Sequence, residues 1–162
     1  MTLIKSISGI RGTIGGKPGD NLTPLDVTKF TAAYGTMLLR SGKIKKVVVG
    51  RDARISGPMI SSIVVNTLIG LGIDVVDLGL STTPTVEIAV PMEQAGGGII
   101  LTASHNPAQW NALKLLNEKG EFISSDEGQT LLKIAENEDF DFSEVFNLGK
   151  VTQDESYIDK HI

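Results

Sequence analysis

The chain has 162 residues, of which 41% are hydrophobic and 21% are charged, and it contains no cysteine. This length suits one domain with a substantial core, and the formal net charge of -4 disfavours a dedicated nucleic-acid-binding protein, which needs a basic face. Because the chain has no cysteine, disulfides and thiolate metal sites are excluded. Neither a membrane-spanning run nor a signal peptide is recognisable, so we expect a cytoplasmic protein.

The N-terminal segment predicts a hairpin and an amphipathic helix. Residues 8–13 (SGIRGT) form a glycine-punctuated turn, and the plainest interpretation of Arg11 within it is an exposed charge. Thr23 and Pro24 are typical of a helix start, because threonine caps a first turn and proline suits its opening position. Apolar residues then recur at helical spacing until Ser41-Gly42, where the helix is predicted to end.

A strand–helix–strand unit follows. Residues 46–50 form a short apolar run that is typical of a strand buried on both faces. A second amphipathic pattern begins at Ser56, and residues 73–78 form the next strand. A crossover of this length predicts a parallel strand pair with a right-handed connection, and therefore an α/β fold.

The second half of the chain continues the alternation. Four elements are predicted: a helix capped within 81–85 and reaching Val90, strands at 98–101 and 109–116, and a helix capped at 124–127. From Glu138 onward the chain is acidic and lacks a clear period. We interpret residues 138–162 as a linker with one short strand near position 150.

The other elements point toward residues 102–107 (TASHNP), which follow a buried strand. Alanine and serine allow a tight turn, and Pro107 biases the preceding residue away from helical conformation, so the loop is predicted to be fixed. It presents the Ser104 hydroxyl beside the His105 imidazole, and a serine becomes a nucleophile next to a base or in a strong field. These residues suit a polar turn as well as a nucleophile loop.

This loop resembles the phosphoserine loop of the α-D-phosphohexomutases, the family of phosphoglucomutase, phosphomannomutase and phosphoglucosamine mutase. Further stretches are similar to family motifs in the same order: Gly-x-Arg-Gly around Arg11, Gly-Arg-Asp-x-Arg at 50–54, and Tyr-Asn-Gly-x-Lys ending at Lys114. In the last motif Trp110 replaces the tyrosine and Ala112 the glycine. The resemblance covers nearly the whole chain, but only the first of the family's four domains.

The resemblance implies a three-layer α/β/α domain with a small, mostly parallel (mixed) sheet. It would occupy residues 1–137, and residues 138–162 would lead toward a second domain that the chain lacks. The remaining domains of the parent mutase are the implied partners, together with a hexose phosphate; neither nucleic acid nor a membrane is expected.

The resemblance also implies phosphoryl transfer. Ser104 would carry a phosphoryl group and exchange it with a hexose phosphate, so that phosphate moves between C1 and C6 through a bisphosphorylated sugar. Arg11 and Lys114 would supply positive charge, and His105 would transfer a proton. The family's Mg²⁺ would bind the phosphorylated Ser104 and aspartates of an absent domain.

Other interpretations stay open at this point. The chain could be a stand-alone sugar-phosphate-binding or regulatory module without catalysis, whereas a serine hydrolase is disfavoured by the lack of a Gly-x-Ser-x-Gly elbow. Without the metal loop and the sugar-recognition domains, the isolated chain is expected to be inactive. The sequence does not choose among glucose, mannose and glucosamine phosphates. Arg51, Asp52 and Arg54 suit either an architectural ion pair or the site itself.

Overall fold

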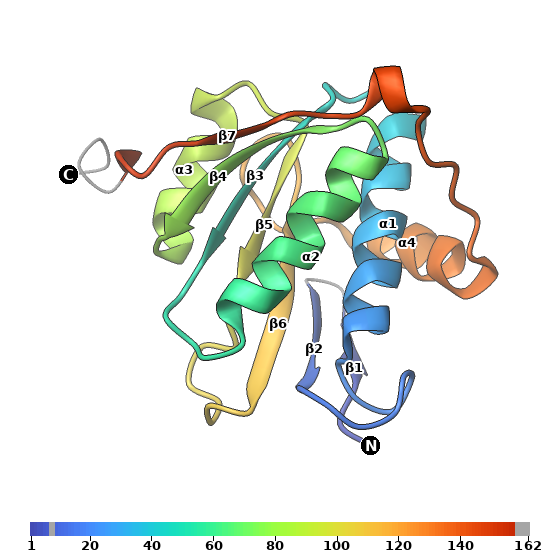
Figure 1. Ribbon diagram of the computed structural model, residues 1–162, viewed down its shortest axis with the longest axis vertical. Helices are drawn as coiled ribbons and strands as arrows, with labels where there is room; N and C mark the ends of the chain where they lie inside the picture. Colours follow the sequence, from blue (N-terminus) through green and yellow to red (C-terminus); the bar gives the residue numbers. More distant parts are fainter. Residues whose placement is uncertain (7–8, 158–162) are drawn as a thin grey trace.

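Seven strands form one mixed sheet at the centre of the computed structural model, which describes residues 1–6 and 9–157 (Figure 1). They are β1 (Ile4–Lys5), β2 (Gly9–Thr13), β3 (Lys46–Arg51), β4 (Asp74–Leu80), β5 (Gly97–Leu101), β6 (Trp110–Leu116) and β7 (Val151–Gln153). Their order across the sheet is β1-β2-β6-β5-β3-β4-β7. The pairings from β5 through β3 and β4 to β7 are parallel, and those from β5 through β6 and β2 to β1 are antiparallel.

Helices cover both faces of this sheet, which confirms the predicted three-layer α/β/α fold. In the described part of the chain they are α1 (Pro24–Arg40), α2 (Gly57–Gly70), α3 (Thr83–Met92) and α4 (Ser125–Asn137). The larger apolar cluster joins α1, α2 and α4 to one face, and a smaller cluster joins α3 to the other.

The predicted starts of α1, α3 and α4 are confirmed by their capping contacts, whereas Ser56 at the start of α2 makes no side-chain capping hydrogen bond. Thr23 and Asp26 form a reciprocal capping box at α1, in which each side chain accepts a main-chain N–H from the other residue. Ser124 and Glu127 do the same at α4, and the hydroxyl of Thr82 accepts the N–H of Thr85 at α3. These contacts satisfy main-chain donors that a helix start leaves unpaired, so the local sequence determines where α1, α3 and α4 begin.

The order of the strands reverses between β3 and β5. β3 connects to β4 through α2 on one face of the sheet, and β4 returns to β5 through α3 on the other. In open α/β sheets, ligands bind outside the carboxyl ends of the strands at such a reversal. The loops that follow β3 and β5 are therefore the place where the topology predicts a site.

A fully buried tyrosine ties α1 to the strands beneath this place. The Tyr34 hydroxyl donates toward the main-chain oxygens of Gly98, at 3.2 Å, and Leu116, at 2.5 Å. Burial raises the pKa of Tyr34 far above its ordinary value, so the phenol stays neutral. The Tyr34 hydroxyl is therefore hydrogen-bonded inside an apolar core, and these hydrogen bonds fix the depth at which α1 packs on β5 and β6.

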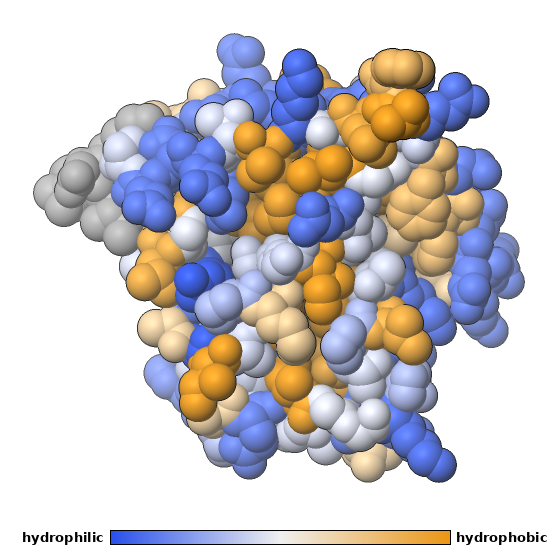
Figure 2. All heavy atoms as spheres, in the orientation of Figure 1, coloured by the Kyte–Doolittle hydropathy of each residue, from blue (hydrophilic) through white to orange (hydrophobic). Residues whose placement is uncertain are grey.

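The segment after α4 packs along the outer edge of the sheet. A short 3₁₀ turn, η1 (Val145–Asn147), leads into β7, which pairs with β4. Tyr157 is buried in the cluster beneath α3 and donates a hydrogen bond to Glu93. Burial, followed by the contact with Glu93, raises the pKa of Tyr157. Several apolar side chains of the segment are exposed, namely Val145, Phe146, Leu148 and Val151. Figure 2 shows hydrophobic surface along the top of the molecule.

Parts of two predicted segments lie outside the described residues, namely Ser8 of the N-terminal motif and positions 158–162 at the end of the predicted linker. Within the residues that are described, no helix is both long enough and apolar enough to cross a membrane.

Candidate functional site

The candidate site lies on the loop between β5 and β6, at the carboxyl end of the parallel strands. Ser104 is exposed there and has φ of +56°, in the left-handed region that non-glycine residues rarely occupy. Its main-chain N–H donates to Thr102 Oγ1 at 3.1 Å, and the N–H of Asn106 donates to the oxygen of Ala103 at 3.0 Å. Local hydrogen bonds thus hold the serine in an uncommon conformation that turns its side chain outward.

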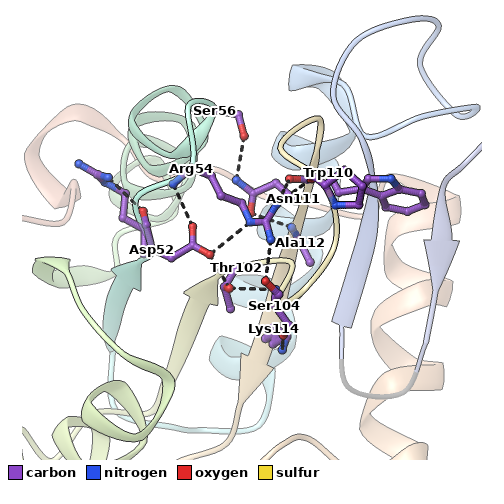
Figure 3. A network of polar contacts seen from close by, with 11 residues as sticks. Asp52, Arg54, Ser56, Thr102, Ser104, Trp110, Asn111, Ala112 and Lys114 are labelled. Carbon is purple, nitrogen blue, oxygen red and sulfur yellow. Dashed lines mark hydrogen bonds and ion pairs between the residues drawn. The ribbon is translucent and has the colours of Figure 1, made fainter.

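Lys114 on β6 contacts the serine directly. Its Nζ donates to Ser104 Oγ at 2.7 Å (Figure 3). Lys114 lies opposite Ile100 in the β5–β6 pairing, and Ile100 belongs to the apolar cluster beneath α3. The lysine therefore projects from the α3 face of the sheet and reaches up to the loop at its edge.

Arg11 lies on the same face, one diagonal step from Lys114. In the pairing of β2 with β6, Arg11 is opposite Ala112 and Gly9 is opposite Lys114. Residues directly opposite one another point to the same side, and a diagonal pair is close enough for long side chains to meet. The structure thus places Arg11, Lys114 and Ser104, three of the predicted site residues, in one neighbourhood.

The charges at this place are unbalanced. Within the described residues, neither Arg11 nor Lys114 forms an ion pair with a carboxylate. Two neighbouring cations repel each other unless an anion lies between them, and guanidinium and ammonium groups are the usual donors to phosphate. This arrangement is suited to binding a phosphoryl group on or next to Ser104 Oγ.

His105 stands apart from these contacts. It is exposed, and it makes no hydrogen bond to any residue that the structure describes. Its predicted role in proton transfer stays a prediction. The side chain of Asn106 likewise makes no contact of this kind, and only its main chain fixes the turn.

Asp52 and Arg54, which follow β3, form hydrogen bonds with the serine loop (Figure 3). Asp52 Oδ2 accepts the hydroxyl of Thr102 at 2.6 Å and Arg54 Nε–H at 3.2 Å. Arg54 also donates to three main-chain oxygens of the loop and its exit: Ser104 at 2.8 Å, Pro107 at 2.8 Å and Trp110 at 3.2 Å. The sequence motif pointed to both residues, whereas Thr102 lay in the predicted loop without an assigned role.

Arg51 is directed elsewhere. It lines a separate hollow of 410 Å³ between α2, β4 and β7, whose lining does not include Ser104. Its Nη1 donates to the main-chain oxygen of Asp52 at 3.2 Å. Of the two arginines in the motif, only Arg54 contacts the serine loop.

The two departures from the family motif fit the structure without special backbone geometry. Ala112 lies within β6, paired with Arg11, and does not have positive φ. A glycine is therefore not required there. Figure 3 shows the indole of Trp110 directed away from Ser104, while its main-chain oxygen receives Arg54. Between them, the amide of the buried Asn111 donates to Ser56 Oγ at 2.9 Å and ties β6 to the start of α2.

The described residues hold no group of three or more acidic, histidine or cysteine side chains that could bind a metal. Near Ser104, the carboxylate of Asp52 is already engaged by Thr102 and Arg54. The acidic stretch after α4 lies elsewhere, where Asp139 pairs with Arg40 at 3.0 Å and this contact lowers the pKa of Asp139. Ser104 could thus contribute one ligand oxygen, and a Mg²⁺ ion would need carboxylates from outside this set.

The chain is similar to known proteins over most of its length. A family model described as phosphoglucomutase/phosphomannomutase, alpha/beta/alpha domain I, matches residues 3–142. The chain is 38% identical to the probable phosphoglucosamine mutase of Methanosphaera stadtmanae, covering 98% of this chain and 35% of that protein. It is 34% identical to the phosphoglucomutase/phosphomannomutase of Thermococcus kodakarensis, covering 89% and 32% respectively.

A solved structure is similar as well. The chain superimposes on a phosphoglucomutase/phosphomannomutase family protein from Burkholderia thailandensis with a TM-score of 0.80 and 28% identity, over 98% of this chain and 34% of that one. The chain therefore spans about a third of the length of the proteins that it matches.

Proposed function

The chain belongs to the phosphoglucomutase/phosphomannomutase family as its alpha/beta/alpha domain I, and on that premise we propose that it carries the phosphoserine of a cytoplasmic hexose-phosphate mutase. The observation that carries this proposal is the contact of Lys114 Nζ with Ser104 Oγ at 2.7 Å, on a serine held in left-handed conformation. The lysine has no carboxylate partner among the described residues, and it faces the atom that would bear the phosphate.

In the proposed reaction, Ser104 Oγ gives its phosphoryl group to one sugar oxygen and then receives a phosphoryl group from another sugar oxygen. The bond between Oγ and phosphorus breaks as the free hydroxyl of a hexose phosphate bonds to phosphorus, and the proton of that hydroxyl ends on Ser104 Oγ, the leaving oxygen. The bisphosphorylated sugar then returns its other phosphate to Ser104, so the net result moves phosphate between C1 and C6. Lys114 and Arg11 lie where they would offset the charge of the moving group, and His105, on the same loop, is the proposed proton carrier.

A bound Mg²⁺ would add positive charge at the phosphate oxygens. Phosphorylated Ser104 would hold it together with carboxylates supplied from outside the described residues. Sugar recognition is likewise assigned to parts outside this chain, which would follow residues 138–162. By itself the 162-residue chain is therefore expected not to complete a turnover.

The test uses the complete protein as the cell makes it, and Ser104→Ala beside a control substitution of the exposed α2 residue, Ser62→Ala. Mass spectrometry should locate one phosphoryl group on Ser104 in the parent and the control. Conversion of hexose 1-phosphate to hexose 6-phosphate, assayed with glucose, mannose and glucosamine phosphates in turn, should be present in the parent and the control and absent in Ser104→Ala. Full activity in Ser104→Ala would overturn the proposal, and hexose-phosphate binding without phosphate on Ser104 would replace it with the binding-module function.

A further inference from the structure

The uncommon backbone conformation of Ser104 needs support from its surroundings. A non-glycine residue is strained in the left-handed region, so a short exposed loop would relax unless neighbouring groups held it. Within the loop, the N–H of Ser104 has one acceptor, Thr102 Oγ1. The position of that acceptor therefore decides where the Ser104 hydroxyl lies.

Thr102 is itself positioned from another strand. It is 8% exposed, and its hydroxyl donates to Asp52 Oδ2 at 2.6 Å. Asp52 in turn accepts the main-chain N–H of Arg54 on its other oxygen at 3.2 Å, and the Arg54 Nε–H on Oδ2. A continuous series of hydrogen bonds thus runs from the end of β3 to the N–H of Ser104.

Arg54 restrains both ends of the loop at once. Its Nη2 donates to the oxygen of Ser104, and its Nη1 donates to those of Pro107 and Trp110. Together with Nε–H on Asp52, four of its five N–H groups are used, and its side chain is 11% exposed. Arg54 is thus engaged by the loop and is not available as the phosphate-binding arginine, unlike Arg11.

We infer that Asp52, Arg54 and Thr102 are positioning residues for phosphoryl transfer, which hold Ser104 Oγ at Lys114 before substrate arrives. This inference rests on the proposed function of Ser104. An ion pair that only stabilised the end of β3 would not need three main-chain oxygens of the serine loop. Placing a reacting atom in advance is worth a large factor in rate, because a shift of about 1 Å can cost about 100-fold.

The first measurement uses the 162-residue chain and does not depend on catalysis. Amide hydrogen exchange is compared for the parent, Thr102→Val, Thr102→Ser and Arg54→Lys. Thr102→Val keeps the shape but removes the hydroxyl, Thr102→Ser keeps the hydroxyl, and Arg54→Lys cannot span three oxygens. We expect faster exchange at residues 103–106 in Thr102→Val and Arg54→Lys, parent-like exchange in Thr102→Ser, and no change in the remote control Arg40→Lys.

The second measurement uses the complete protein and separates kcat from KM. Thr102→Val and Asp52→Asn should lower kcat by about 10- to 100-fold with an unchanged KM for the hexose 1-phosphate that the parent converts, and Thr102→Ser should restore kcat to within about threefold of the parent. An unchanged kcat in a folded Thr102→Val protein, or an effect on KM alone, would overturn the inference. A parent that shows neither phosphoserine nor activity would instead refute the proposed function, while the exchange data would still show whether Thr102 and Arg54 hold the loop.

Discussion

Lys114 offers the sharpest quantitative test of the site, because its effect on a phosphate at position 104 can be measured without turnover. The perturbation is Lys114→Met in the 162-residue chain carrying genetically encoded phosphoserine at position 104. Methionine keeps much of the length and apolar stem of lysine and removes only the charge. The matched control is Lys133→Met on the exposed side of α4, because Lys133 makes no ion pair with any residue that the structure describes.

The magnitude follows from the contact distance. Nζ is 2.7 Å from Ser104 Oγ, so the oxygens of an attached phosphate would lie about 4 Å away. At that distance one unit of charge is worth about 4 kcal/mol at an effective dielectric constant of about 20 and about 1 kcal/mol in water. Ser104 is exposed and Lys114 half-buried, so the effect should lie near the lower limit, at about one pH unit in the titration of the phosphate.

The assay is phosphorus NMR as a function of pH. Free phosphoserine loses its second proton at about pH 6. In the parent we expect the midpoint to be lower, because Lys114 and Arg11 favour the dianion, and in Lys114→Met we expect it to rise by about one pH unit. Lys133→Met should titrate like the parent. Identical midpoints for the parent and Lys114→Met would show that Lys114 does not face the phosphate and would refute the electrostatic reasoning.

Four further predictions concern stability, and the last of them tests one departure from the family motif. Tyr34→Phe should lower the free energy of unfolding by about 1–2 kcal/mol in urea titrations, because two buried carbonyls lose a donor. Gly97→Ala should destabilise the parent more than it destabilises Tyr34→Phe, because a Cβ at Gly97 would collide with the Tyr34 hydroxyl. The hydrogen bond from Lys43 lowers the pKa of Glu118, so the ionised carboxylate stabilises the fold above its unfolded pKa, and this stability is lost as the pH falls through the lower folded pKa. The urea midpoint of Glu118→Gln should therefore depend less on pH than that of the parent between pH 7 and about 3. The difference should be small, because the ion pair is partly exposed. Ala112→Gly should destabilise by about 0.5–1 kcal/mol without moving the phosphate titration, since Ala112 has ordinary strand geometry; a stabilising effect would contradict this assignment.

The features that were predictable from sequence are those determined by neighbouring residues. Thr23 and Pro24 mark the start of α1, and Ser124 with Glu127 marks the start of α4, because the capping contacts span only three residues. The buried run before Thr102 likewise marks β5. Such signals need no knowledge of the rest of the fold, which is why the alternation of helices and strands in an α/β fold could be predicted from the residues, whereas the three-layer arrangement was implied by the resemblance.

The support of the loop could not be predicted in the same way. Thr102 and Asp52 are 50 residues apart, and they meet because β3 and β5 are adjacent and parallel, a pairing that a local pattern does not specify. The contacts of Arg54 depend in addition on the course of the loop up to Trp110. The sequence thus left Asp52 and Arg54 undecided between an ion pair and a functional role. The place of Lys114 beside Ser104 was implied only by resemblance.

The open position of Ser104 has a kinetic consequence. In the 162-residue chain, a phosphate on the exposed Ser104 hydroxyl would be in contact with bulk water, and such contact would destroy an acyl-enzyme or another reactive intermediate. Phosphate monoesters differ, because their uncatalysed hydrolysis is so slow that enzymes can accelerate it by up to about 10²¹-fold. A serine monoester at this position could therefore survive long intervals between encounters with sugar. The phosphorylated serine could therefore persist in the 162-residue chain even in full contact with solvent.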